Sequence, residues 1–403
     1  MFFIHKPPSP GAVYPKFIGS LLEIYAKFIR ICMHIHTYMR TMSFQPNFTI
    51  TPAISKALMR IEADRKMVTN MHVSTQILHS LRESARLTAT HYSTQIEGNR
   101  LSQEEVAVVV QGGTFPHRER DEQEVKNYYQ ALEYVDLLIK HQHHVTDAEI
   151  QTIHGLVYEG KQKVSPYRDG QNVIRDGRSG AIVYLPPEAK DVPTLMQTLI
   201  AWLQNTMRDN TLPVPIIAAI THYQFATIHP YFDGNGRTAR LLTNLVLHLS
   251  DYGMNGIYTL EEYYAKHLTA YYEALTVGPS HNYYFGRAEA DITAWIHYFC
   301  EGMAEAFSSI KTHIVSFNEP THHTPNQDAL RWLDQRQKLV LMLFKKQAMV
   351  STKDIATQLH LHPRSALNYC KKWCEEGFLI QHGTANKNRH YTLAEKWHGL
   401  SSR

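Results

Sequence analysis

The sequence predicts a mostly α-helical protein with one inserted β-hairpin and a C-terminal winged helix-turn-helix. Apolar residues recur at three- and four-residue spacing along most of the chain from Thr51 onward, which is typical of amphipathic helices. Glycine, proline and aspartate interrupt this pattern at residues 165–193, around two short β-prone runs that read as a hairpin. After residue 328 the chain becomes basic, and a first helix and a tight pair of helices precede two strand-like runs.

Length and composition describe a soluble globular protein. The chain has 403 residues, 43% hydrophobic and 19% charged, and a formal net charge of +4. This length suggests two or three domains. Four scattered cysteines do not form a disulfide framework, which favours a reducing, cytoplasmic setting. Residues 1–43 are interpreted as a mis-started or disordered extension, with a peripheral amphipathic anchor as the alternative; charges at Glu23, Lys27 and Arg30 argue against a membrane span.

The helices are expected in a simple order. The predicted helical segments of the body are 54–68, 76–98, 121–141, 146–160, 193–207, 214–228, 237–253, 259–275 and 288–314. Gly98 ends the second segment as a C-terminal glycine does. The hairpin, at 172–187, separates the fourth segment from the fifth.

The C-terminal module differs from the body in charge. Residues 329–403 hold 13 Lys and Arg against 5 Asp and Glu, a net charge of +8, whereas the rest of the chain holds 28 against 32, a net charge of −4. Contact with DNA and docking of a protein, for target selection or dimerisation, remain open for this module. The residues expected on its recognition helix are Arg364, Ser365, Asn368, Lys371 and Lys372. Cys370 and Cys374 are assigned to a buried helix face rather than to a metal site.

The stretch HPYFDGNGRTAR, at 229–240, contains groups that bind phosphates. Glycines on both sides of Asn235 let successive N–H groups surround an anion where a helix begins. Arg237 and Arg240, three positions apart, share one helix face and can hold neighbouring phosphates.

Two further side chains of this stretch supply the chemistry. Asp233 is a hard oxygen ligand suited to Mg²⁺ that bridges phosphates. His229 can take a proton from an attacking hydroxyl. Because the stretch has no serine or cysteine nucleophile, that hydroxyl is expected to belong to the substrate.

These residues resemble the signature H-x-F-x-[DE]-G-N-G-R-x-x-R of the Fic family, with Tyr231 where phenylalanine is common. The resemblance extends from about Phe44 to Ile314. It implies a Fic-type helical domain that transfers AMP from ATP, with Mg²⁺, to a hydroxyl side chain of a protein, with His229 as general base and Asp233 as metal ligand. It implies ATP contacts from Glu97, Asp233, Gly234, Asn235, Gly236, Arg237, Thr238, Ala239, Arg240 and Tyr271. A phosphate-transferring sub-branch has lysine at the second glycine, so Gly236 favours transfer of AMP.

The resemblance also assigns the hairpin and a tyrosine pair. The hairpin corresponds to the family's flap, which pairs with the target segment as an added strand, and Ile182, Val183 and Tyr184 are the expected target contacts. Tyr271 matches a nucleoside contact. Because His267 and Leu268 stand where the family often has Asn and a basic residue, the alternative is that the tyrosines pack a helix.

The fragment STQIEGN resembles the family's inhibitory motif, [ST]-x-x-x-E-[GN], at Ser93 and Glu97. A carboxylate on a neighbouring helix would form an ion pair with Arg240 and occupy the place that the γ-phosphate needs. The alternative is an exposed glutamate before a helix-ending glycine. Some family members also use this glutamate to activate water and remove AMP.

The predicted organisation follows from these assignments. The expected parts are the extension 1–43, an N-terminal helical region with the inhibitory helix at 44–130, the Fic catalytic core at 131–317, a linker at 318–328 and the winged helix-turn-helix at 329–403. The predicted function is that of an autoinhibited protein adenylyltransferase whose partner is a target protein or itself. Alternatives are a de-AMPylase and a DNA-binding regulator with a Fic-like sensor body. A homodimer is one arrangement considered, and no membrane partner is expected.

Overall fold

The computed structural model describes residues 44–71, 73, 75–175, 179–278, 280–318, 333, 335–359, 361–383 and 389–400. The predicted extension and nearly all of the predicted linker lie outside these residues. The chain divides into Met1–Gln45 and Pro46–Arg403, and the second unit contains almost all of the described residues. In the described part of the chain, no helix is both long enough and apolar enough to cross a membrane.

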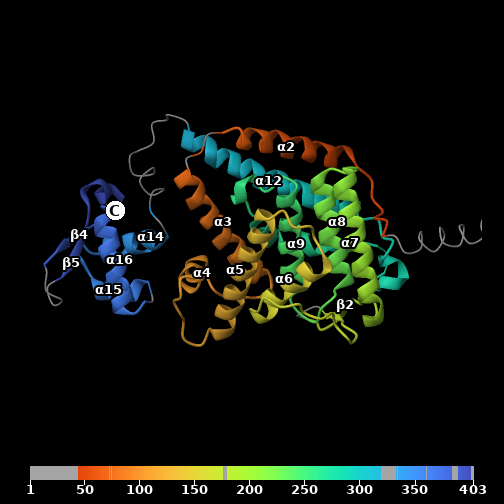
Figure 1. The fold of residues 1–403 in the computed structure, drawn as a ribbon, viewed down its shortest axis with the longest axis horizontal. Helices are drawn as coiled ribbons and strands as arrows, with labels where there is room; N and C mark the ends of the chain where they lie inside the picture. The colour runs from red at the N-terminus through yellow and green to blue at the C-terminus, as the bar shows by residue number, and fades with distance from the viewer. Residues whose placement is uncertain are drawn as a thin grey trace, which may run out of the picture. The chain divides into compact units, whose positions relative to one another are not determined.

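The body is helical, as the sequence predicted (Figure 1). Its first helices are α2 (Pro52–Thr69), α3 (Thr75–Ile96), α4 (Gln103–Val110), α5 (Glu119–Lys140) and α6 (Asp147–Glu159). After the hairpin come η1 (Ala189–Asp191), α7 (Val192–Asp209), α8 (Val214–Ile228), α9 (Asn235–Leu249), η2 (Met254–Gly256), α10 (Glu261–Lys266), α11 (Leu268–Leu275), η3 (Tyr283–Arg287) and α12 (Thr293–Asn318).

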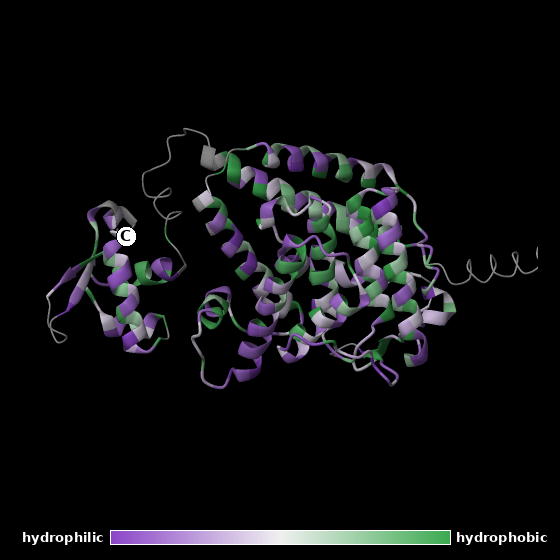
Figure 2. Ribbon diagram, in the orientation of Figure 1, coloured by the Kyte–Doolittle hydropathy of each residue, from purple (hydrophilic) through white to green (hydrophobic). Residues whose placement is uncertain are grey.

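Helix α8 forms the centre of the body. Of its 15 residues, 13 are buried, so nearly all of its surface is covered by other elements. It packs against α7, α9 and α12. Figure 2 shows this segment as mostly hydrophobic, whereas the outer helices carry hydrophilic faces. Because every side of α8 is covered, its C-terminal end is a rigid point from which a functional loop can start.

Helix α3 ends where the sequence predicted. Its last residue is Ile96, and Gly98 follows with φ of 96°, a left-handed conformation that glycine adopts without a steric cost. The N–H groups of Gly98 and Asn99 donate to the carbonyls of Gln95 and Thr94, which closes the helix end. Glu97 therefore lies on a fixed turn at the end of α3, which also packs against α5, α9 and α10.

The inserted hairpin is short. Strands β1 (Ile174–Arg175) and β2 (Ile182–Tyr184) pair antiparallel with an irregular register, and residues 176–178 lie outside the described part. A parallel bridge joins Leu185 to Asn282, so the end of the hairpin is attached to the segment before η3. The strands occupy fewer residues than the predicted 172–187 because the flanking segments are held by side chains instead of a ladder.

The C-terminal module has a core of its own. It consists of α14 (Gln335–Phe344), β3 (Val350–Ser351), α15 (Thr352–Gln358), α16 (Pro363–Glu375), β4 (Leu379–His382), β5 (His390–Leu393) and η4 (Glu395–Leu400). Its antiparallel sheet has the order β3-β5-β4, so the two predicted strands are joined by a third, β3. Cys370 and Trp373 are buried in a cluster made only of residues 333–397, which agrees with the buried helix face expected for α16. Helices followed by a hairpin are the order of elements that the sequence predicted for this module.

Candidate active site

The loop between α8 and α9 carries the phosphate-binding motif. Helix α8 stops at Ile228, and His229 caps it in the left-handed conformation, with φ of 52°. Pro230 follows, which has no N–H to continue the helical ladder. Gly234, with φ of 78°, turns the chain into α9, whose first residue is Asn235. The loop therefore presents backbone N–H groups at the N-terminal end of a 15-residue helix, where an anion is favoured.

Asn235 holds this loop closed from the inside. Its Oδ1 accepts from the N–H of Tyr231 at 3.0 Å, and its Nδ2 donates to the carbonyl of Tyr231 at 2.8 Å. The Asn235 side chain is thus committed to the loop backbone, and only its main-chain N–H is placed to face a phosphate. The sequence placed Asn235 in the phosphate nest without foreseeing this bracing role.

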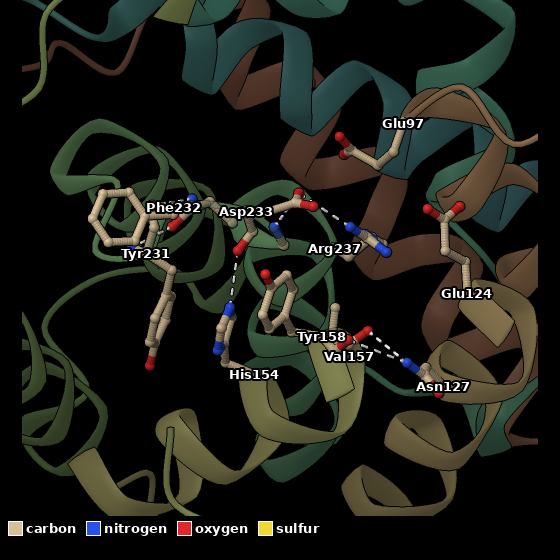
Figure 3. A network of polar contacts seen from close by, with 12 residues as sticks. Glu97, Glu124, Asn127, His154, Val157, Tyr158, Tyr231, Phe232, Asp233 and Arg237 are labelled. Carbon is tan, nitrogen blue, oxygen red and sulfur yellow. Dashed lines mark hydrogen bonds and ion pairs between the residues drawn. The ribbon is translucent and has the colours of Figure 1, made fainter. Parts of the chain in front are cut away.

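His154 supports the loop from below, and sequence reasoning missed it. Its Nε2–H donates to the carbonyl of Asp233 at 2.9 Å, so Nδ1 accepts from the hydroxyl of Ser165 at 2.8 Å. Its ring stacks on Tyr231 with 3.5 Å between ring centroids (Figure 3). His154 lies on α6, 79 positions from Asp233, so no local spacing could have indicated the contact.

Arg168 connects the catalytic loop to the base of the hairpin. Its Nε donates to the carbonyl of His229 at 2.9 Å, and its Nη1 donates to the carbonyl of Gly170 at 3.0 Å. Its Nη2 reaches the carbonyl of Pro187. Asn172 adds a hydrogen bond from Nδ2 to the carbonyl of Tyr231 at 3.1 Å. These contacts fix the distance between the hairpin and the histidine.

The tautomer of His229 follows from its one ring contact. Nδ1 lies 3.3 Å from the carbonyl of Ala226, which can only accept, so Nδ1 carries the proton. Nε2 is then the unprotonated nitrogen. Burial lowers the pKa of His229 to about 4, which keeps the ring neutral at pH 7. A neutral imidazole with a free Nε2 can accept a proton.

Two arginines of α9 lie behind the loop. Arg237 donates to Oδ1 of Asp233 at 3.2 Å, while its Nε is buried and has no hydrogen-bond partner among the described residues. Arg240 is only 1% exposed. Its Nε donates to the Ser93 hydroxyl at 2.8 Å and its Nη2 to the Ser93 carbonyl at 2.9 Å. Both guanidinium groups are therefore held in place. Nε of Arg237 is the donor without a partner among the described residues.

Glu97 completes the coordination of Arg240. Its Oε1 accepts from Nη2 of Arg240 at 2.8 Å, and its side chain is 30% exposed. A Cβ atom built on Gly236 would lie 2.3 Å from the same Oε1. The carboxylate thus sits directly against the second glycine of the loop and pairs with the arginine predicted to hold an outer phosphate. The expected ion pair is present, between residues 143 positions apart.

The residues present fit a magnesium ion that arrives with phosphates. The Asp233 side chain is 58% exposed, and its Oδ1 accepts from the N–H of Gly234 at 2.6 Å. Mg²⁺ is commonly held by one or two carboxylates together with substrate phosphates and water. In the described part of the chain, no group of three or more His, Cys, Asp or Glu side chains could hold a metal alone.

Several predicted ATP contacts are buried. Thr238 and Ala239 are fully buried, so neither side chain is open to ATP in this structure. Tyr271 is 3% exposed. Its hydroxyl donates to Nε2 of His222 at 3.0 Å, because Nδ1 of His222 donates to the hydroxyl of Thr243. Tyr271 therefore faces the helical core in this structure, and the exposed ring of the pair belongs to Tyr272.

The hairpin presents two of its three predicted contact residues. Ile182 and Val183 are exposed, whereas Tyr184 is buried and its hydroxyl donates to the carbonyl of Thr227 at 2.6 Å. Tyr184 thus anchors the hairpin to α8. The sequence did not single out Phe232, whose ring is exposed beside Gly170 and next to the predicted metal ligand.

Comparisons with known proteins identify similar sequences for part of this chain. Residues 144–247 match the model of the Fic/DOC family. The protein adenylyltransferase fic-1 of Caenorhabditis elegans is 30% identical over 221 residues, which are 50% of this chain and 42% of that protein. The protein adenylyltransferase Fic of Drosophila melanogaster is 27% identical over 203 residues, 49% of this chain and 39% of that protein. The chain thus spans less than half the length of these curated relatives.

Solved structures share the fold. A Fic family protein from Desulfovibrio desulfuricans has a TM-score of 0.57 at 23% identity and covers 87% of this chain and 99% of its own. A Fic domain containing signaling protein from Bacteroides thetaiotaomicron has a TM-score of 0.56 at 20% identity and covers 66% of this chain and 100% of its own.

The burial of His222 predicts a pH-dependent stability. Burial, with the nearby Arg240 charge, lowers the pKa of His222 to about 3 from 6.5. Between these values the unfolded chain binds a proton that the folded chain does not, so stability falls as pH drops from 6.5 towards 3. Replacing this imidazole by a non-titrating side chain, His222→Gln, should reduce the slope of unfolding free energy against pH by up to about 1.4 kcal/mol per unit. Urea melts from pH 7 to 4 measure this slope, with the exposed position His144→Gln as control.

Proposed function

Because residues 144–247 form a Fic domain on the helical fold of Fic proteins, we propose that this chain is an autoinhibited protein adenylyltransferase. It transfers AMP from ATP to the hydroxyl of a serine, threonine or tyrosine in a target protein or in itself. One observation carries the proposal. A neutral His229 with a free Nε2 lies on the same braced loop as a glycine-flanked helix N-terminus backed by two buried arginines.

In the proposed reaction, the base, the phosphate-binding groups and the metal ligand each have one role. Nε2 of His229 takes the proton of the target hydroxyl as its oxygen bonds to the α-phosphorus. The bond from that phosphorus to the bridging oxygen breaks, and pyrophosphate leaves. Backbone N–H groups of the loop, Arg237 and Arg240 hold the negative charge that develops on the leaving group. Mg²⁺ on Asp233 would neutralise phosphate charge. The phosphates of ATP raise the pKa of the buried imidazole towards neutrality, which suits a general base.

Glu97 is proposed to inhibit AMP transfer by competing with a phosphate of ATP. The outer phosphates of ATP need the guanidinium of Arg240, and that group is already bonded to Glu97 at 2.8 Å. The carboxylate also lies against Gly236, so a phosphate in front of this glycine would meet a like charge. ATP can bind productively only when Glu97 moves, and its position on the turn after α3 permits such a movement without unwinding the helix.

The hairpin is proposed to hold the target. Ile182 and Val183 are exposed on β2, and an extended target segment could pair with this strand. Arg168 ties the base of the hairpin to the carbonyl of His229, so a segment paired there is held at a fixed distance from the base. Main-chain pairing depends little on the side chains of the target segment, so other surfaces must select the target protein.

Removing the Glu97 carboxylate should increase transfer. Glu97→Gly frees Arg240 for the outer phosphate. Incorporation of label from α-labelled ATP into protein should therefore rise by at least about tenfold, because the ion pair that competes with the phosphate is removed. Gln95→Gly is the matched control, because it introduces the same flexible residue at the end of α3 and keeps the carboxylate. Equal or lower incorporation in Glu97→Gly would rule out this inhibitory role.

Loss of the general base should separate binding from chemistry. In the Glu97→Gly background, His229→Ala should lower AMP transfer about 10² to 10⁴-fold and leave ATP affinity nearly unchanged, since the loop and arginines hold the phosphates. Calorimetric ATP titration and α-label incorporation measure the two quantities. Undiminished transfer without His229 would refute its role, and label only from γ-labelled ATP would indicate a phosphotransferase.

A second candidate function rests on the C-terminal module. All five residues predicted on the recognition helix are exposed along α16: Arg364, Ser365, Asn368, Lys371 and Lys372. Together with the net charge of +8 on residues 329–403, this favours contact with a nucleic acid backbone. The chain would then be a DNA-binding regulator in which the Fic domain acts as an enzyme or a sensor.

DNA binding by the full chain should depend on these lysines and on salt. Lys371→Gln should weaken duplex affinity about equally for different sequences and reduce the slope of log affinity against log salt by about one. Lys353→Gln, on α15, is the matched control for general charge. Fluorescence anisotropy at several salt concentrations measures both. Salt-independent affinity would contradict the electrostatic assignment and favour protein docking instead.

A further inference from the structure

A cavity lies along helix α3, on the N-terminal side of Ser93. Its volume is about 720 Å³, and its walls come from α2, α3, α5, α9 and the segment 251–258 around η2. This volume is within the range of small-molecule sites. No residue of the motif at 229–240 lines it. It is therefore a separate concavity of the body and not an extension of the candidate active site.

The wall of this cavity is amphipathic. Its buried part consists of apolar side chains, Ala85, Ala89, Leu132, Val135 and Met254, together with Tyr258. The cavity wall therefore suits a ligand with an apolar or aromatic part.

The rim of the cavity is cationic. Four cationic side chains line it, Arg65, Arg82, Arg86 and Lys140, against the two carboxylates Asp136 and Asp251. Arg86 is paired with Asp136, and Arg65 is paired with Glu62 on its own helix.

Two of these cations remain available. Arg82 donates from Nε to the carbonyl of Asn255, a neutral acceptor, and Lys140 forms no ion pair in the described part of the chain. Both side chains are exposed at the mouth. His248, also in the wall, is kept neutral because burial lowers its pKa to about 4. Glu62 balances Arg65, and Glu83 and Asp136 balance Arg86, so it is Arg82 and Lys140 that favour an anionic ligand.

The cavity shares two helices with the Glu97–Arg240 ion pair. Ala89 lies one turn before Ser93 on α3, and Ser93 accepts from Nε of Arg240 at 2.8 Å. Asn244 lies one turn after Arg240 on α9 and also lines the cavity. A ligand that touches both walls would favour the spacing of α3 and α9 at which the ion pair forms.

We propose that this cavity binds a small organic phosphate and that its occupancy holds α3 in the position from which Glu97 reaches Arg240. The phosphate lies between Arg82 and Lys140, and the organic part covers the apolar wall below Tyr258. The proposal of a binding site rests on the cavity and its lining residues alone. The effect on ATP rests on the proposed function, because it requires that Glu97 compete with a phosphate of ATP. By linkage, a ligand that prefers the paired state must weaken ATP binding.

Phenyl phosphate is a suitable probe, because it combines one aromatic ring with one phosphate. Calorimetric titration of the full chain should show one saturable site that inorganic phosphate fills more weakly. Arg82→Gln and Lys140→Gln should each weaken binding about tenfold, as expected for loss of one charge-assisted hydrogen bond. Lys56→Gln, an exposed position on α2 outside the cavity, is the matched control. Thermal melts without the probe check that the variants fold.

The Arg237→Gln variant distinguishes the cavity from the catalytic loop. Binding of phenyl phosphate should persist in this variant. Absence of binding in the wild-type chain, affinity unaffected by both rim variants, or loss of binding in Arg237→Gln would each overturn the site. Equal affinity for inorganic phosphate would contradict the role of the apolar wall.

The coupling has its own measurement. Saturating phenyl phosphate should lower ATP affinity several-fold in the wild-type chain and have less effect in Glu97→Gly. An equal effect in both chains would overturn the coupling and indicate direct competition, while the site itself would still be judged by the rim variants. Neither titration requires turnover, so an absence of AMP transfer would refute the proposed function without refuting this site.

Discussion

A guanidinium removed from water must be bonded on every side, and Arg240 is such a group at the centre of this protein. It is 1% exposed, and it donates three hydrogen bonds to Ser93 and Glu97. Leaving a buried charge without a partner is costly, so some anion must always face it. In this structure that anion is the carboxylate of Glu97. In the proposed function, the same requirement makes Arg240 a phosphate ligand once the carboxylate leaves, so inhibition and catalysis compete for one cation.

The catalytic loop needs rigidity as much as reactive groups. A helix N-terminus binds a phosphate well only if the preceding turn keeps its N–H groups aligned. Asn235 braces the turn from within, His154 holds it from α6, and Arg168 fixes its start against the hairpin. These three side chains can affect the proposed reaction by holding the loop, without contacting substrate. They hold in place the proposed base at the beginning of the loop and the proposed anion site at its end.

Helix α3 connects Glu97, the proposed inhibitory residue, to the rest of the body. Its end carries Glu97, its last turns carry Ser93, and its earlier turns form one wall of the amphipathic cavity. A helix moves as a unit more readily than its side chains rearrange one by one within a close-packed interior. A ligand of the proposed cavity site that biases the position of α3 therefore acts on the Glu97–Arg240 ion pair through one element.

The sequence by itself determined the helical fold class, the end of α3 at Gly98, and the candidate residues His229, Asp233 and Arg240, because these depend on local periodicity and on short, specific spacings. It also supported the pairing of Glu97 with Arg240, although only through a resemblance. Tertiary structure alone decided what lies between distant segments: that His154 and Arg168 brace the loop, that Asn235 is turned inward, and that Tyr184 and Tyr271 are buried. Exposure of a tyrosine depends on which helices pack over it, and a hydrogen bond across 79 positions depends on how two elements dock. Neither leaves a periodic signal in the chain, because packing between elements is set by the whole fold and not by neighbouring residues.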